Sequence, residues 1–87
     1  QFYLDDPYPN PFNPVVSIKY SASNISNITF AIYDIDGRMV NQFNKGVQNP
    51  GDYSFNWDAS NYASGMYFIK MIADNKIITT KKITLIK

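Results

Sequence analysis

The feature that most constrains this fold is a proline-rich segment near the amino terminus, Tyr8-Pro9-Asn10-Pro11-Phe12-Asn13-Pro14. Each proline fixes its own φ, lacks a backbone donor and disfavours helical backbone at the residue before it. Such a segment is expected to be stiff and extended, and it cannot lie in the middle of a sheet, because neighbouring acceptors would stay unpaired. We predict that residues 1–14 form a lead-in along a sheet edge, with Tyr8 and Phe12 as anchors. The alternative is a rigid linker that follows another domain.

The composition excludes several common classes of protein. The chain has 87 residues, enough for one small domain, and it contains neither cysteine nor histidine. Disulfides, thiolate metal sites and a histidine proton shuttle are therefore excluded. A net charge of +1 offers no basic face for nucleic acid. No apolar run approaches the roughly 18 residues that a membrane-spanning helix needs. We expect a soluble domain without a cofactor, and its start at Gln1 instead of Met indicates part of a longer protein.

A period-two alternation of apolar and polar residues predicts a series of short strands. The clearest strand is residues 52–58, in which Tyr53, Phe55 and Trp57 alternate with polar residues and should face the core. Residues 66–73 are apolar at both parities, which indicates a central strand. Further strands are expected at residues 15–21, 28–33, 38–43 and 77–86. No segment has the period of a helix.

Turn signals separate these strands. Asp36-Gly37 predicts a two-residue hairpin turn in which both residues tolerate positive φ, and Asp74-Asn75 predicts a second tight turn. Residues 44–51 contain two glycines and a proline, and we expect them to form a longer loop that crosses between sheets. Regularly spaced strands of this kind predict an all-β fold, an antiparallel immunoglobulin-like sandwich of about seven strands over residues 15–87, without the usual disulfide. Trp57 is then the central core aromatic, and Tyr67 is a candidate corner tyrosine.

Five short motifs follow one another in a characteristic order. They are Tyr8-Pro9-Asn10-Pro11-Phe12-Asn13-Pro14, Ile32-Tyr33-Asp34 with Gly37-Arg38, Gly51-Asp52-Tyr53, Trp57-Asp58, and Ala63-Ser64-Gly65-Met66-Tyr67-Phe68. In this order the chain resembles the type A C-terminal sorting domain of type IX secretion, which is found on exported proteins of Bacteroidetes and their relatives. The resemblance extends from about Tyr8 to Lys87. The immunoglobulin-like domain of flagellar hook capping proteins shares most of the pattern.

The resemblance implies a function in protein export. It implies that the domain ends a cargo protein, folds as a sandwich in the periplasm, and is recognised by an outer-membrane translocon. A sortase-like peptidase then removes it, at or upstream of Gln1 to Asp6, and attaches the cargo to a surface glycolipid. The family's Gly-x-Tyr strand and lysine-rich final strand make Gly65, Tyr67, Lys81, Lys82 and Lys87 the candidates for recognition. No enzymatic activity is expected.

Other interpretations of these residues stay open. Lys81 and Lys82 are also explained as protection of an exposed edge strand against unwanted pairing, including pairing with a second copy of the chain. Exposed aromatics such as Tyr62 and Phe68 are compatible with a carbohydrate-binding or adhesive module. A structural or adhesive extracellular module that spaces neighbouring domains is therefore the alternative function.

Two sets of side-chain oxygens are weaker candidates for a calcium site. They are Asp58, Ser60 and Asn61, and the pair Asp5 and Asp6. Turn capping explains the first set better, and a solvated surface explains the second. A further carboxylate pair at the hairpin tip, residues 34 and 36, lacks the cleft that a glycosidase pair requires.

Overall fold

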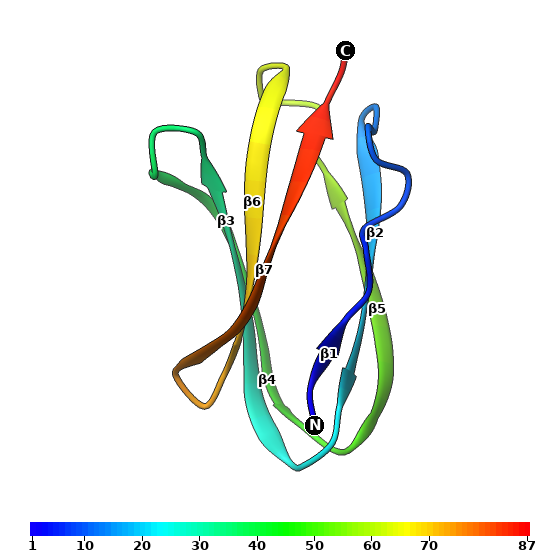
Figure 1. Cartoon of the computed structure of the whole chain (residues 1–87), viewed down its shortest axis with the longest axis vertical. Helices are drawn as coiled ribbons and strands as arrows, with labels where there is room; N and C mark the ends of the chain where they lie inside the picture. Colours follow the sequence, from blue (N-terminus) through cyan, green and yellow to red (C-terminus); the bar gives the residue numbers. More distant parts are fainter.

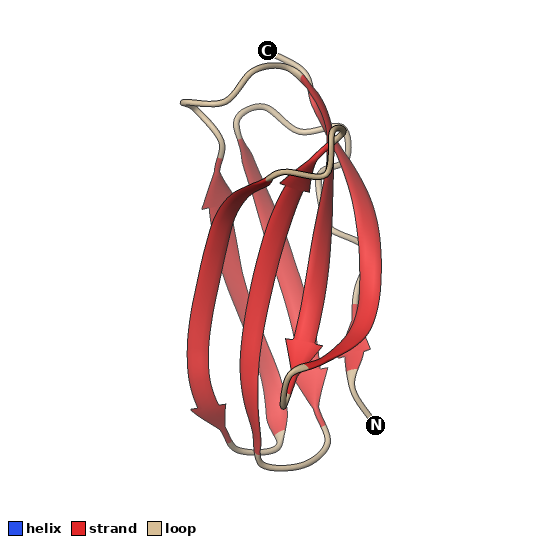
Figure 2. Cartoon of the chain, turned by 90° about the vertical axis from the view of Figure 1, so that its left-hand side faces the viewer, coloured by secondary structure: helices blue, strands red, loops and turns tan.

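The computed structural model describes residues 1–87, which form seven strands in two packed sheets and contain no helix (Figures 1 and 2). The strands are β1 (Tyr3–Leu4), β2 (Val15–Ala22), β3 (Ser26–Asp34), β4 (Met39–Gln48), β5 (Gly51–Asp58), β6 (Gly65–Ala73) and β7 (Lys76–Leu85). The first sheet has the order β1-β2-β5, the second has the order β4-β3-β6-β7, and all named strand pairs are antiparallel. The predicted all-β sandwich is confirmed, and no helix is available to cross a membrane.

The core lies between the two sheets and follows the alternation in the sequence. In the first sheet β2 and β5 pair Val16 with Trp57 and Ile18 with Phe55, so that one face of each strand points inward. Trp57 is 1% exposed, which confirms its predicted place in the core. β6 lies between β3 and β7 in the second sheet, as predicted for a central strand.

Two aromatic clusters fill the two ends of the core. The ring of Trp57 lies 5.8 Å from that of Phe12 and 5.5 Å from that of Tyr67. At the other end Tyr20 lies 4.7 Å from Phe30 in an edge-to-face arrangement. Aromatic pairs at such separations stabilise a core beyond their burial alone, which matters in a domain with so few buried residues.

The β3–β4 turn differs from its predicted form. Gly37 donates its backbone N–H to the carbonyl of Asp34, and Asp34 in turn donates to the carbonyl of Arg38, so the loop holds three residues and not two. Only Gly37 has a positive φ, +82°, and Asp36 does not. The carboxylate of Asp34 accepts the backbone N–H groups of Asp36 and Arg38 at 2.9 and 3.0 Å. That capping favours the wider loop and leaves one position for glycine.

The β6–β7 connection within the second sheet and the β4–β5 connection between the sheets are both short. Asp74 and Asn75 both have positive φ, 50° and 67°, and they join β6 to β7 in the predicted tight turn. The predicted long loop over residues 44–51 is wrong, because β4 continues to Gln48 and only two residues separate it from β5. Gly46, with a φ of +72°, follows an irregularity in the β3–β4 pairing that lets the strand continue through it. The predicted crossing between sheets at this point is confirmed.

The first fourteen residues pack onto the sandwich. Backbone hydrogen bonds join Asp5 to Lys19, and Tyr8 to Ser17, along the edge of β2. The segment is not extended as predicted, because the chain bends at residues 9–11 and again at 13–14. Three of its four Xaa–Pro peptide bonds, those before Pro9, Pro11 and Pro14, are cis. Of the two predicted anchors, Phe12 is buried in the core, but the side chain of Tyr8 is 77% exposed and Leu4 is buried in its place. The division of the chain into a lead-in of residues 1–14 and a sandwich domain of residues 15–87 stays a prediction.

Candidate recognition site

The final strand β7 lies at an edge of the second sheet, and the lead-in closes half of that edge. The side-chain amide of Asn10 donates from Nδ2 to the carbonyl of Lys82 at 3.0 Å, and its Oδ1 accepts the backbone N–H of Thr84 at 3.0 Å. One side chain thus replaces the donor and the acceptor of a strand residue. Pro11, which follows it, has no N–H to offer.

Phe12 continues the pairing with its own backbone. Its N–H donates to the carbonyl of Thr84 at 2.9 Å, and its carbonyl accepts the N–H of Ile86 at 3.0 Å, in a parallel bridge beside Leu85. The ring of Phe12 is buried against Trp57. We call these contacts of Asn10 and Phe12 with residues 82–86 the clasp. The clasp accounts for the Asn-Pro-Phe sequence. Asn10 pairs with the strand edge through its side chain, Pro11 has no N–H to donate, and Phe12 pairs with the edge through its backbone.

The other half of β7, residues 76–81, has β6 as its only strand neighbour. An irregularity in the β6–β7 pairing falls between Met71 and Ile72 and leaves Ile78 without a partner. Bulges and lysines both deter unwanted pairing at an open edge. Edge pairing with a second copy of the chain stays a prediction.

The three candidate lysines do not form one cluster. The ammonium of Lys81 lies 2.9 Å from Oδ1 of Asp6, and this hydrogen bond raises the pKa of Lys81. Lys82 is exposed and forms no ion pair. Lys87 donates from Nζ to the carbonyl of Ser60 at 2.6 Å and ties the carboxyl terminus to the β5–β6 loop. A partner that contacts all three lysines must therefore cover more than one face of the domain.

Gly65 and Tyr67 occupy structural positions. Gly65 begins β6 with a φ of +154°, which side-chain-bearing residues rarely adopt. Tyr67 is buried, and its hydroxyl donates to the carbonyl of Ala63 at 2.6 Å, as expected of a corner tyrosine. Burial, together with the nearby charge of Asp34, raises the pKa of Tyr67. Tyr67 thus has no surface with which to contact a partner directly, and its part in recognition stays a prediction.

Carboxylates that were candidates for metal or acid chemistry cap turns instead. Oδ1 of Asp58 accepts the backbone N–H of Ser60 at 3.0 Å as well as its hydroxyl, and these bonds lower the pKa of Asp58. Hydrogen bonds from backbone N–H groups, that of Arg38 first, likewise lower the pKa of Asp34. Asp6 pairs with Lys81, whereas Asp5 lines a surface depression on the first sheet. Of these two neighbouring carboxylates, only that of Asp6 forms an ion pair.

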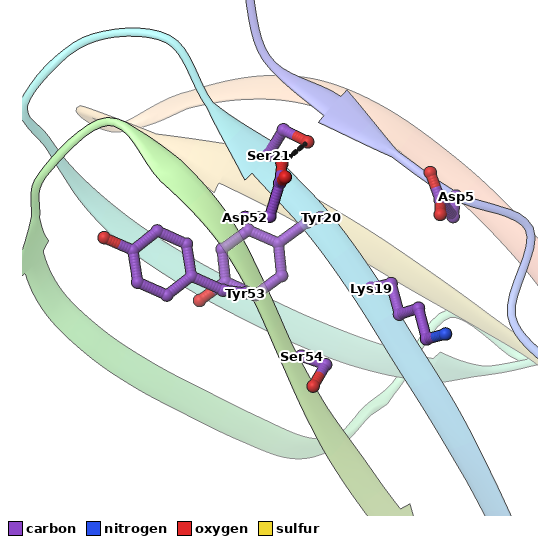
Figure 3. Close-up of a pocket in the computed structure, with 7 residues that line it drawn as sticks. All are labelled: Asp5, Lys19, Tyr20, Ser21, Asp52, Tyr53 and Ser54. Carbon is purple, nitrogen blue, oxygen red and sulfur yellow. Dashed lines mark hydrogen bonds between the residues drawn. The ribbon is translucent and has the colours of Figure 1, made fainter.

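The depression beside Asp5 lies over β2 and β5 and has a volume of about 410 Å³. Figure 3 shows Lys19, Ser21, Asp52 and Ser54 around it, with the hydroxyl of Ser21 donating to Asp52 at 2.8 Å. Its polar side chains are typical of the solvated face of an antiparallel sheet.

The clasp could not be inferred from local patterns, because Asn10 and its partners lie 72 and 74 positions apart. The only signal for it was the pair of Asn-Pro steps.

The sequence as a whole matches one protein-family model, described as "Secretion system C-terminal sorting domain", over residues 7–87. The chain belongs to this family. The resemblance to type IX sorting domains is thereby confirmed, and the domain is a C-terminal secretion signal for export to the cell surface or the medium. Such a signal interacts with the secretion machinery. No curated protein sequence matches the chain.

Three solved structures resemble the fold. The alkylpurine DNA glycosylase AlkC of Pseudomonas fluorescens, bound to DNA, aligns with a TM-score of 0.76 at 8% identity, over 100% of this chain and 30% of that one. PorZ, a surface component of the type IX secretion system of Porphyromonas gingivalis, aligns with a TM-score of 0.64 at 23% identity, over 99% of this chain and 11% of that one. CopC from Methylosinus trichosporium aligns with a TM-score of 0.62 at 21% identity, over 98% of this chain and 93% of that one. At these identities the likeness shows the fold alone.

Proposed function

We propose that this domain carries a cargo, linked at its amino terminus, through the periplasm to an outer-membrane translocon of type IX secretion. The translocon recognises the folded sandwich. A sortase-like peptidase then removes the domain at or upstream of Gln1 to Asp6 and attaches the cargo to the cell surface. The observation that carries the proposal is the family match over residues 7–87, which includes both halves of the clasp.

The positions of the two termini support this arrangement. The amino and carboxyl termini lie at opposite ends of the long axis (Figure 1), which measures 37 Å. A cargo attached at Gln1 therefore leaves the end of β7 and the β5–β6 loop free for a partner. Gln1 precedes β1 and is exposed, so a peptidase can reach the chain at this residue without opening the sandwich.

The proposed role is not catalytic, and the two turn-capping carboxylates of Asp34 and Asp58 fit this role. An acid catalyst needs a carboxyl group whose pKa is raised by its surroundings. Asp34 and Asp58 have their pKa values lowered by hydrogen bonds, and both cap turns. Both carboxylates stabilise turns in their ionised form.

An export experiment tests the proposal. A periplasm-targeted fluorescent protein fused ahead of residues 1–87 is expressed in a host with type IX secretion, and fluorescence is measured on the surface and in the periplasm. We expect the fusion to reach the surface, and a fusion that lacks residues 77–87 to stay in the periplasm. If the intact fusion stays in the periplasm while the host exports its own cargo, a structural or adhesive module replaces the sorting function.

A further inference from the structure

The outer faces of the two sheets differ in character. On the first sheet the outward positions of β2 and β5 pair Ser17 with Asn56, Lys19 with Ser54, and Ser21 with Asp52. All of these side chains are polar. A solvated face of an antiparallel sheet normally has this composition.

The outer face of the second sheet carries an apolar cluster at the end nearest the β3–β4 hairpin. β3 places Tyr33 opposite Phe68 of β6 and Met39 of β4. Met66 and Ile72 lie on the same side of β6 as Phe68, because the alternate residues of that strand are buried in the core. Met39 is 51% exposed and Met66 is 37% exposed. No further layer of the protein covers this face, and large exposed apolar patches mark interaction sites.

A groove of about 320 Å³ runs along this face beside the β3–β4 hairpin. We call it the aromatic groove; it is lined by Tyr33, Asp34, Ile35, Gly37, Phe68, Lys70 and Thr80. Ile35 at the hairpin tip is 64% exposed although it is a large apolar residue. The hairpin thus adds an apolar side chain to the sheet, and the groove is lined by residues of β3, the β3–β4 loop, β6 and β7.

The charged side chains around the groove carry a net positive charge. The ammonium of Lys70 lies 4.4 Å from the centre of the Tyr33 ring and forms no ion pair. Lys82, paired in register with Phe68, is also without a carboxylate partner. The two carboxylates nearby, Asp34 and Asp36, both pair with Arg38. The groove therefore complements a surface that offers carboxylates beside apolar side chains.

These features favour a protein over a sugar or a second copy of this chain. Met39 and Met66 are adaptable apolar groups of the kind found on protein-binding surfaces, and Ile35 adds a further exposed apolar side chain. The carboxylate of Asp34, which a sugar hydroxyl would need as an acceptor, is already occupied by Arg38 and the backbone. Two copies that met through this face would bring their Lys70 and Lys82 charges together.

We propose that the aromatic groove is the surface on which a protein of the secretion machinery docks, through carboxylates that reach Lys70 and Lys82 and apolar side chains that cover Tyr33 and Phe68. This inference rests on the proposed sorting function and identifies the surface to which the partner binds. The groove lies on the outer face of the second sheet, which faces away from the first sheet.

The test uses charge reversal on the two outer faces. Lys70→Glu changes the groove, and Lys19→Glu makes the same change on the polar face of the first sheet. Both variants keep the aromatic and aliphatic core, and their melting temperatures are measured first. In the export experiment we expect Lys70→Glu to lower surface fluorescence about tenfold, the effect of losing a close charge pair, and Lys19→Glu to export normally. Phe68→Thr, which keeps a strand-forming residue, should also reduce export. Equal export of all three folded variants overturns the proposal.

A binding measurement keeps the inference testable if the intact fusion is not exported. The domain, labelled at a cysteine in place of Gln1, is titrated with detergent-solubilised outer membrane of the same host, and fluorescence anisotropy is followed. We expect saturable binding that salt weakens, that protease treatment of the membrane extract abolishes, and that Lys70→Glu weakens about tenfold. Binding that survives protease indicates a glycan or lipid, and self-association that Lys70→Glu abolishes indicates a second copy. Either result overturns the proposal, as does equal binding by Lys70→Glu and Lys19→Glu.

Discussion

Asn10 and Thr84 are 74 positions apart in the chain and are joined by a hydrogen bond of 3.0 Å from the backbone N–H of Thr84 to Oδ1 of Asn10. The same amide donates to the carbonyl of Lys82. A side chain thus completes the pairing of the last strand at the point where prolines prevent a backbone from doing so. The amino-terminal lead-in and the last strand are therefore stabilised together.

Loss of the Asn10 amide should destabilise the domain. Asn10→Ala removes two hydrogen bonds to the backbone of β7, and we expect a loss of about 1–3 kcal/mol in the free energy of unfolding, measured in urea. Asn13→Ala is a matched control, because Asn13 also precedes a proline but makes no side-chain hydrogen bond in the structure. The clasp is unimportant if the two variants lose the same stability.

Truncation of the central tryptophan should be severe. Trp57 is 1% exposed and lies beside Phe12, Tyr62 and Tyr67. Removal of a buried aromatic costs about 3–5 kcal/mol, a large share of the stability of a small domain. Trp57→Ala should be largely unfolded near room temperature by circular dichroism, whereas Trp57→Phe keeps an aromatic in the core and stays folded. Wild-type emission should be blue-shifted, and emission like that of indole in water would contradict the buried position.

The β3–β4 loop should depend on glycine at one position. Gly37 has a φ of +82° with open space around it, so a replacement there is opposed by backbone strain and not by crowding. Gly37→Val should cost about 1–3 kcal/mol and lower the melting temperature clearly. Gly37→Asn should be milder, because asparagine tolerates this conformation better. Ser23→Ala, whose hydroxyl has no hydrogen-bond partner, should change little. Similar melting temperatures for all three variants would contradict the assigned loop.

Local patterns predicted the parts of the fold whose causes are local. Asp74-Asn75 could be identified as a turn because both residues tolerate positive φ. The β3–β4 loop could not be predicted in detail, since its length depends on the carboxylate of Asp34 capping two backbone groups. Likewise the length of β4 depends on its pairing with β3, which continues past Gly46. The clasp and the groove join residues distant in sequence, so no local pattern reveals them.

Acid should weaken the domain through the turn-capping carboxylates. The pKa values of Asp34 and Asp58 are lowered in the folded state from an ordinary value of 3.8. Their contribution to stability is therefore fully present above about pH 4 and is lost as the pH falls through the lowered values. The melting temperature of the wild type should drop as the pH falls below about pH 4, and more steeply than that of the Asp34→Asn, Asp58→Asn double variant. Parallel curves would show that these carboxylates do not carry the pH dependence.

The last prediction separates a recognised charge from a structural ion pair at Lys81. Its ammonium is bound to Asp6, so Lys81→Ala and Asp6→Ala break the same contact, but only the first removes the lysine from the open half of β7. Exposed ion pairs contribute little to stability, and both variants should melt like the wild type. If the translocon contacts the Lys81 charge, the fluorescent fusion with Lys81→Ala is exported poorly while the fusion with Asp6→Ala is exported normally. Equal loss in both would assign the effect to the ion pair between the lead-in and β7. Normal export of both would leave the backbone of the strand edge, and not this charge, as the feature that is recognised.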